Sequence, residues 1–268
     1  MSETTNAAEG GKDLLLANLS WPEVRDLIDD VDLVLIPVGS NEQHGPNLSV
    51  NFDIAHSAEF CRRVSERVYP KVLVAPAVPW GVSFHHMNFP GTITLSTDTF
   101  NQVLLEIVDS LHQHGFNRFL FVNGHGGNVA PLGVAVVDIQ EAVNPVFVGA
   151  CSIFNFQDRV EIDKLYKTTG EGGHACERET SVGMYLAPET VKTDALAPGQ
   201  MTDLSRGFRK TLAKYGVSVP YSFDAFTTDG ALGDATLSTV EYGRDLTERA
   251  LDNMVGFIEE LVANSPVE

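Results

Sequence analysis

Four short apolar runs alternate along the chain with segments of helical periodicity, and this alternation restricts the fold more than any other feature. The runs are rich in Val, Leu, Ile and Phe, and they cover residues 31–40, 71–80, 117–124 and 144–154. Near-continuous apolar runs of this length are typical of strands buried on both faces. Strands that alternate with helices favour a parallel sheet. The sequence therefore predicts an α/β fold with a mostly parallel β-sheet flanked by helices.

The predicted helices lie between and after these runs. Ser20, with Glu23 three residues later, has the pattern of a capping box and opens a short helix over 19–30. Helical periodicity also covers 53–68, 97–115, 129–143 and 238–264, and Gly243 is a point where the last helix could break. Residues 155–235 contain many Gly, Asp, Thr and Ser, which predicts long loops and one helix near 177–187. No repeat or linker divides the chain. We expect a single domain over 13–268 behind a flexible N-terminal tail over 1–12.

Charge and composition exclude several classes of partner. The chain has 36 acidic and 18 basic residues, for a formal net charge of −18. Nucleic acids and anionic membrane surfaces are bound by clustered Lys and Arg, so we expect no nucleic acid and no membrane partner. No apolar run approaches the roughly 18 residues that span a bilayer. The three cysteines form no CxxC pair, and the polar N-terminus lacks the apolar core of a signal peptide. The expected location is the cytoplasm.

Residues of the metal-ligand type follow three of the predicted strands where each strand ends. The first strand is followed by "GSNEQHGPNLSVNFD" (39–53), the second ends in "PWGVSFHHMNFPG" (79–91) and the third in "NGHGGN" (123–128). In an open parallel sheet, ligands bind beyond the carboxyl ends of the strands. We therefore expect these segments to meet at one rim of the sheet.

The first segment is the most informative. Glu42 and His44 are two residues apart, so an extended chain would point both side chains the same way. Together with Asp53 they offer carboxylate oxygens and an imidazole, which suit Zn, Mn, Fe or Mg. The alternative is structural: Asp53 caps a helix, Glu42 is a loop acid, and His125 is a buried histidine in a glycine-rich turn.

Two further segments contain candidate residues. In "GEGGHACERETS" (170–181), His174 and Glu177 are three apart and would share a face if a helix starts there, whereas Glu179 would point elsewhere. The alternative is a cluster of acids that favours a helix N-terminus. In "HHMNFPG" (85–91), at least one histidine is expected to face substrate or a neighbouring subunit, unless the segment is only a polar loop.

Four motifs resemble the creatininase family, also called creatinine amidohydrolases. They are "PVGSNEQHGPNLSVNFD", "NFPGTITL", "VNGHGGN" and "GGHACERETSVGMYLAPE", in the order that the family has them, and the resemblance covers about residues 18–190. It implies a creatininase-like fold, a homohexamer built as a trimer of dimers, and two divalent metal ions bridged by an aspartate and a water. It places Glu42 and His125 on one metal, His44 on the other and Asp53 between them. The fifth ligand would be Glu177, with Glu179 as the alternative.

The resemblance also implies the chemistry. The family pattern predicts hydrolysis of a C–N amide bond, in a cyclic amide or formamide of a small-molecule substrate, with the water between the metals as the nucleophile. Zinc is the first expected metal, with manganese and iron as alternatives. The catalytic residues would be His174, as general acid, and Asp53, which shares in the proton transfer. The residues expected to contact substrate are Gly126, Gly127, Phe154, His86 and Trp80.

Departures from creatininase itself bear on the substrate. Creatininase has an acid where this chain has Gly127, and large aromatic residues where it has Phe154, Gly170 and Gly126. Creatinine is therefore not the expected substrate. The resemblance leaves open a metal-dependent C–C or ring-opening hydrolase of a keto-inositol-type substrate and a mycofactocin-type peptidase. A non-enzymatic binding protein is disfavoured, because clustered ligand-type residues are costly to bury without a metal.

Overall fold

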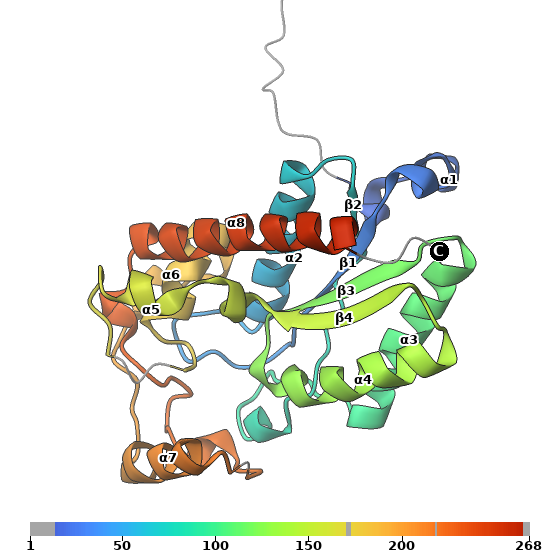
Figure 1. Ribbon diagram of the computed structural model, residues 1–268. Coiled ribbons are helices and arrows are strands. Elements are labelled where there is room, and N and C mark those ends of the chain that lie inside the picture. Colours follow the sequence, from blue (N-terminus) through green and yellow to red (C-terminus); the bar gives the residue numbers. More distant parts are fainter. Residues whose placement is uncertain (1–13, 170–172, 218, 265–268) are drawn as a thin grey trace, which may run out of the picture.

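The sheet of this protein has four parallel strands in the order β2-β1-β3-β4. The computed structural model describes residues 14–169, 173–217 and 219–264 (Figure 1). The predicted N-terminal tail (1–12) and Gly170 lie outside the described residues. The strands are β1 (Leu33–Val38), β2 (Val72–Val74), β3 (Arg118–Asn123) and β4 (Phe147–Ser152). All three strand pairs are parallel, which confirms the predicted fold class.

Two layers of helices cover the sheet (Figure 1). One face carries α2 (Phe52–Arg67), α6 (Glu177–Leu186) and α8 (Val240–Asn264), and the other carries α3 (Thr97–Gln113) and α4 (Val129–Ala142). The shorter helices are α1 (Trp21–Leu27), which has the predicted Ser20–Glu23 capping box, and α5 (Arg159–Asp163). None of the helices in the described ranges is long and apolar enough to cross a bilayer.

Alternate residues of β1 show why its sequence is apolar throughout. Leu33 and Leu35 pack with α2 and α8, whereas Val34 and Ile36 pack with α3 and α4. All four side chains are almost completely buried. A strand covered on both faces has no solvent face on which a polar residue is favoured. The two sets of contacts form one core on each side of the sheet.

Three local predictions differ from the structure. β2 has only three residues instead of the predicted run over 71–80, because Pro76 and Pro79 have no N–H to donate to a ladder. α8 continues through Gly243, where a Cβ would lie 1.8 Å from the carbonyl oxygen of Ser181; this glycine allows close packing of α8 on α6. The helix α7 (Asp203–Tyr215) was not predicted from the sequence, and it stands apart from the sheet in Figure 1.

The strand order decides where the ligand-type residues meet. From β1 the chain passes to β2 on one side of the sheet and then to β3 on the other side, so the connections diverge between β1 and β3. Such a switch point leaves a crevice at the carboxyl ends of the two strands. Val38 and Asn123 are paired there at the strand ends. The loops that carry Glu42, His44 and His125 start within a few residues of this pair.

Candidate metal centre

Glu42, His44 and Asp53 are held together by the loop after β1 and the first turn of α2. Nε2 of His44 lies 3.1 Å from Oδ1 of Asp53 and 3.9 Å from Oε1 of Glu42. The other ring nitrogen of His44, Nδ1, donates a hydrogen bond of 3.1 Å to the carbonyl oxygen of Glu42. Because a carbonyl only accepts, this bond places a proton on Nδ1 and leaves Nε2 facing the carboxylates. Gly39 lets the loop after β1 approach α2 closely, since a Cβ at this position would lie 2.7 Å from the main-chain nitrogen of Ile54.

The glycines around His125 let the end of β3 approach α2. A Cβ on Gly124 would lie 2.8 Å from the main-chain oxygen of Asp53, so only glycine permits this approach. Nδ1 of His125 then lies 3.1 Å from Oδ2 of Asp53 and 3.2 Å from Oε2 of Glu42. Asn123 holds the turn: its side chain donates to the carbonyl of His125 and accepts from the amide of His125.

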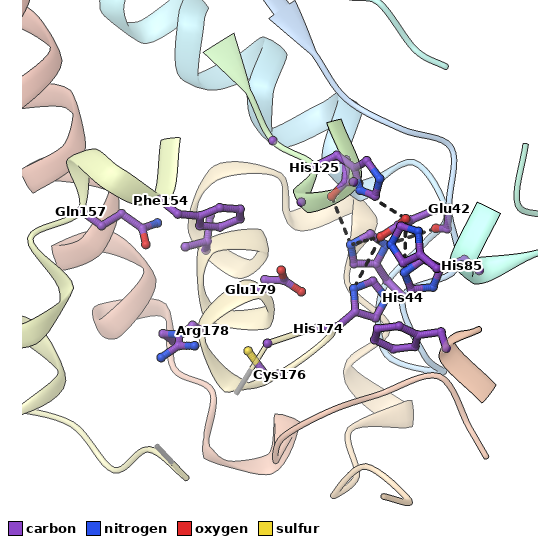
Figure 2. A pocket seen from close by; sticks show the side chains of 18 of the residues that line it. Glu42, His44, His85, His125, Phe154, Gln157, His174, Cys176, Arg178 and Glu179 are labelled. Carbon is purple, nitrogen blue, oxygen red and sulfur yellow. Dashed lines mark hydrogen bonds and ion pairs between the residues drawn. The ribbon is translucent and has the colours of Figure 1, made fainter. Parts of the chain in front are cut away.

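His174 and Glu179 reach the same place from the start of α6. Nδ1 of His174 lies 3.5 Å from Oε1 of Glu42, and the ring is buried. Candidate ligand atoms of His44, His174 and Glu179 lie within 4.8 Å of one another. Figure 2 shows Glu179 projecting into the pocket that His44 and His174 also line.

The structure does not bring Glu177 to the cluster, and this corrects the first choice of fifth ligand. Oε1 of Glu177 accepts hydrogen bonds from the amide (2.7 Å) and hydroxyl (2.9 Å) of Thr169, and Oε2 accepts from the amide of Asp234 (3.1 Å). The prediction from spacing is wrong because α6 begins only at Glu177. His174 precedes the helix, and Ala175 has a left-handed φ of 50°, so His174 and Glu177 share no helical face. Glu179, the alternative, takes the position facing the cluster.

The second loop contributes both of its adjacent histidines. His85 and His86 lie on a short 3₁₀ turn (Phe84–His86), and both line the pocket. Nε2 of His86 lies 3.5 Å from Oε2 of Glu42. Trp80 instead is half-exposed and lines a separate apolar groove beside α3, so the structure does not place it in the pocket of its own chain.

The pocket over this cluster has a volume of about 290 Å³. Four of the five residues predicted to contact substrate line it, namely His86, Gly126, Gly127 and Phe154. Several other lining or supporting residues were not predicted from the sequence. Gln43 lies between two predicted ligands in the sequence, and Ser83 precedes the histidine pair, so proximity to a motif was the signal available for both. Nothing in the sequence pattern pointed to Gln157 or Arg178.

Three carboxylates share this small volume: Glu42 and Asp53 are buried, and Glu179 is partly buried. The ion pairs that Glu42 and Asp53 form within the described residues are all with histidines. Burial favours the neutral imidazole of His44, but the charges of Asp53 and Glu42 outweigh it and raise its pKa to about 10. Burial raises the pKa of Glu179 to about 7; the charge of His44 opposes this rise and the charge of Asp53 adds to it. The cluster is therefore short of positive charge.

The donor set fits divalent metal ions. Oδ2 of Asp53 is buried and accepts no well-aligned hydrogen bond from the described residues, although His125 lies close to it. A buried carboxylate oxygen without a hydrogen bond is costly unless a cation supplies the missing interaction. Carboxylates and neutral imidazoles are the ligands that zinc, manganese and iron accept. The arrangement is that of a metal-dependent hydrolase site.

Comparison with known proteins identifies the family. The family model described as creatinine amidohydrolase (Creatininase) matches residues 17–258. The mycofactocin precursor peptide peptidase of Mycobacterium ulcerans is 32% identical over 232 residues, which cover 84% of each chain. The 3-dehydro-scyllo-inosose hydrolase of Thermotoga maritima is 27% identical over 270 residues, covering 92% of this chain and 83% of its own. The chain thus belongs to the creatininase family, whose members are metal-dependent hydrolases.

The solved structures agree with this assignment. A putative creatinine amidohydrolase from Bacteroides fragilis superposes with a TM-score of 0.82 at 25% identity, over 97% of this chain and 100% of the other. The match confirms the parallel sheet and its helical layers. The chain is an enzyme of the hydrolase class, and its candidate site lies where the fold brings the family motifs together.

Proposed function

We propose that this protein is a dinuclear metal-dependent hydrolase that cleaves a C–N amide bond, in a cyclic amide or formamide of a small molecule. The observation that carries the proposal is the position of Asp53. One of its oxygens faces His44 at 3.1 Å, and the other faces His125 at 3.1 Å. A carboxylate placed between two separate imidazoles is suited to bridge two cations.

The residues divide into two groups around Asp53. Glu42 and His125 would hold one ion, His44 and Glu179 the other, and Asp53 both. When bound, two divalent ions supply an acidified water as nucleophile and polarise the carbonyl oxygen of the substrate. Zinc is the first candidate, and manganese and iron have the same ligand preferences here.

His174 is proposed to move the proton. Its Nε2 donates to the carbonyl oxygen of Gln43 at 2.6 Å, so Nδ1 carries the lone pair toward the site. Burial, and then the neighbouring charge of His44, lower the pKa of His174 well below its ordinary value. A neutral His174 can take a proton at Nδ1 and pass it to the leaving nitrogen. Asp53 is the carboxylate nearest to the nucleophile in this scheme.

Other residues of the pocket position these groups and the substrate. Oγ of Ser83 donates to Oε2 of Glu42 and lies 3.0 Å from Nε2 of His125, so it supports both side chains. Gly126, Gly127, Phe154 and His86 line the space left for the substrate. Trp80 would contact substrate only in the site of a neighbouring subunit. A homohexamer and a cytoplasmic location stay predictions.

The relatives favour two alternative reactions on the same residues. The Thermotoga maritima hydrolase is named for a keto-inositol substrate, which suggests ring-opening or C–C bond hydrolysis. The Mycobacterium ulcerans relative is named as a peptidase. Each of these reactions uses a polarised carbonyl, so the metal ligands do not separate them.

Elemental analysis and a substrate screen test the proposal together. We expect about two metal ions per chain, and chelator-sensitive release of amine or formate from a panel of cyclic amides, formamides and short peptides. His125→Ala and Asp53→Ala should lower metal content and abolish activity. Metal without amide cleavage, but with a ring-opened acid from a keto-inositol, would favour the alternative reaction. Failure to bind Zn, Mn or Fe would contradict the metal centre itself.

A further inference from the structure

The pocket has a second end, which the proposed reaction does not use. Figure 2 shows Phe154, Gln157 and Arg178 toward the opposite side of the pocket from His44 and His85. Arg159 also lines the pocket. This end is formed by the segment after β4 and by the first turn of α6. The acids and histidines of the candidate metal centre thus face an end that carries two guanidinium groups and an amide.

Gln157 is the clearest sign that a ligand binds there. The residue is only 3% exposed and lines the pocket. Within the described parts of the chain, its side-chain amide makes no hydrogen bond. The amide atoms are reached from the pocket, so a water or a ligand there can complete their hydrogen bonds. Gln157 therefore offers a donor and an acceptor to something in the pocket.

The two arginines give this end its charge. The side chain of Arg178 is 14% exposed and lines the pocket, and its Nη1 lies 3.6 Å from Oδ2 of Asp163. Arg159 is exposed at the rim, and within the described ranges its side chain forms no ion pair. Two guanidinium groups on one pocket are unusual in a chain of net charge −18. They make this end attractive to an anion.

The planar geometry favours a carboxylate. A guanidinium presents parallel N–H groups that match both oxygens of a carboxylate, and a primary amide adds a further donor. We propose that Gln157, Arg159 and Arg178 form a subsite that binds the carboxylate of an acylated amino acid or similar amide, whose scissile bond lies at the candidate metal centre. The inference rests on the proposed function and names its substrate class. A phosphate group offers the same chemistry and is distinguished by the test.

Calorimetry on the full-length, metal-loaded protein tests the subsite with three aromatic probes. Hippurate carries a carboxylate, hippuramide is its neutral counterpart, and phenyl phosphate carries a phosphate. We expect hippurate to bind about tenfold or more tightly than hippuramide. The same preference should persist after chelation, because the subsite contains no metal. If phenyl phosphate binds more tightly than hippurate, the ligand of the subsite is a phosphate group and not a carboxylate.

Substitutions at the three subsite residues show which side chains bind the carboxylate. Arg178→Gln and Gln157→Met should each remove most of the preference for hippurate, and Arg159→Gln part of it. Arg244→Gln, at an exposed arginine on α8 that does not line the pocket, is the matched control and should change nothing. Arg178→Lys keeps the charge beside Asp163, so it controls for folding and should retain part of the preference.

Two results would overturn the inference. The first is equal binding of hippurate and hippuramide. The second is a preference for hippurate that chelation abolishes but Arg178→Gln leaves intact, because that result would place the carboxylate on the metals. The outcomes also separate this inference from the proposed reaction. Carboxylate preference without amide hydrolysis would contradict the proposed reaction alone, and hydrolysis without the preference would contradict the subsite alone.

Discussion

Nε2 of His174 lies 2.6 Å from the main-chain carbonyl oxygen of Gln43. Because that carbonyl can only accept, the ring must carry its proton on Nε2 and present the Nδ1 lone pair to the pocket. Gln43 stands between Glu42 and His44 in the sequence, so the segment that supplies two candidate ligands also sets the tautomer of the proposed proton carrier. The geometry ties proton transfer to the metal centre without making His174 one of the proposed ligands.

His174→Ala should therefore abolish activity while both metals stay bound. Loss of a general acid or base lowers kcat by about 10²–10⁴-fold. The measurement is kcat together with metal content by elemental analysis. Asp53→Ala serves as the comparison, because it should lose metal as well as activity. Loss of metal from the His174 variant would make His174 a ligand and contradict its assigned role.

The two acids of α6 should behave differently when neutralised. Glu179→Gln removes a charge that faces His44, so we expect it to lose about half of the bound metal and nearly all activity. Glu177→Gln should keep the metal and lose stability, since the carboxylate accepts three hydrogen bonds from Thr169 and Asp234. Removing hydrogen bonds to a buried charge costs about 1.5–3 kcal/mol each.

Elemental analysis and urea denaturation of the two variants separate these effects. Metal loss from the Glu177 variant, with full retention in the Glu179 variant, would restore Glu177 as the fifth ligand.

Gly126 and Gly127 give a matched pair of substitutions one residue apart. A Cβ on Gly127 would lie 2.3 Å from the carbonyl oxygen of Val82 and 2.4 Å from Nε2 of His125, whereas a Cβ on Gly126 meets nothing within 4 Å. Gly127→Ala should cost about 1–3 kcal/mol of stability and displace His125, with loss of metal. Gly126→Ala should change neither quantity. Equal thermal unfolding temperatures and equal metal contents for the two variants would contradict this prediction, because they would show that the loop shifts to accommodate the extra methyl group.

The crowding at Gly127 is consistent with our proposal that the fifth ligand comes from α6. The resemblance places an acid at this loop position in creatininase, but here even a methyl group would collide with His125. Glu179 supplies a carboxylate from the opposite side of the pocket instead.

The thiols of Cys61 and Cys151 should make stability depend on alkaline pH. Burial raises the pKa of Cys151 to about 12, and burial, with Cys151 nearby, raises the pKa of Cys61 well above its ordinary value. The folded state therefore holds these protons at a pH where the unfolded state releases them. Their contribution to stability is complete below the unfolded thiol pKa of about 8.5 and is lost as pH rises toward 12.

Urea denaturation between pH 7 and pH 10 measures this loss. The free energy of unfolding should fall by up to about 1.4 kcal/mol per pH unit for each thiol above pH 9, and Cys151→Ala should reduce the slope. Iodoacetamide at pH 8 should modify the folded protein far more slowly than the unfolded protein. Alkylation at equal rates in both states would mean that the thiols are accessible.

The sequence by itself determined the fold class and most of the site. Apolar runs such as 31–40 are typical of strands covered on both faces, and every residue of β1 is indeed buried. Parallel strands place their carboxyl ends at one edge, so the motifs after β1 and β3 had to meet. The convergence of Glu42, His44, Asp53 and His125 followed from those two facts and from the family motifs.

Only the tertiary structure decided which acid of α6 faces the site. The first residue of a helix and the left-handed φ of Ala175 depend on contacts between distant segments, among them the hydrogen bonds of Glu177 to Thr169 and Asp234. The residues at the far end of the pocket were also decided only by the tertiary structure. Gln157 and Arg178 are 21 residues apart in the chain and carry no periodic signal, and packing of α5 and α6 beside α8 brings them to one cavity. Spacing along the sequence predicts contacts within one element, whereas contacts between elements are set by how the elements pack.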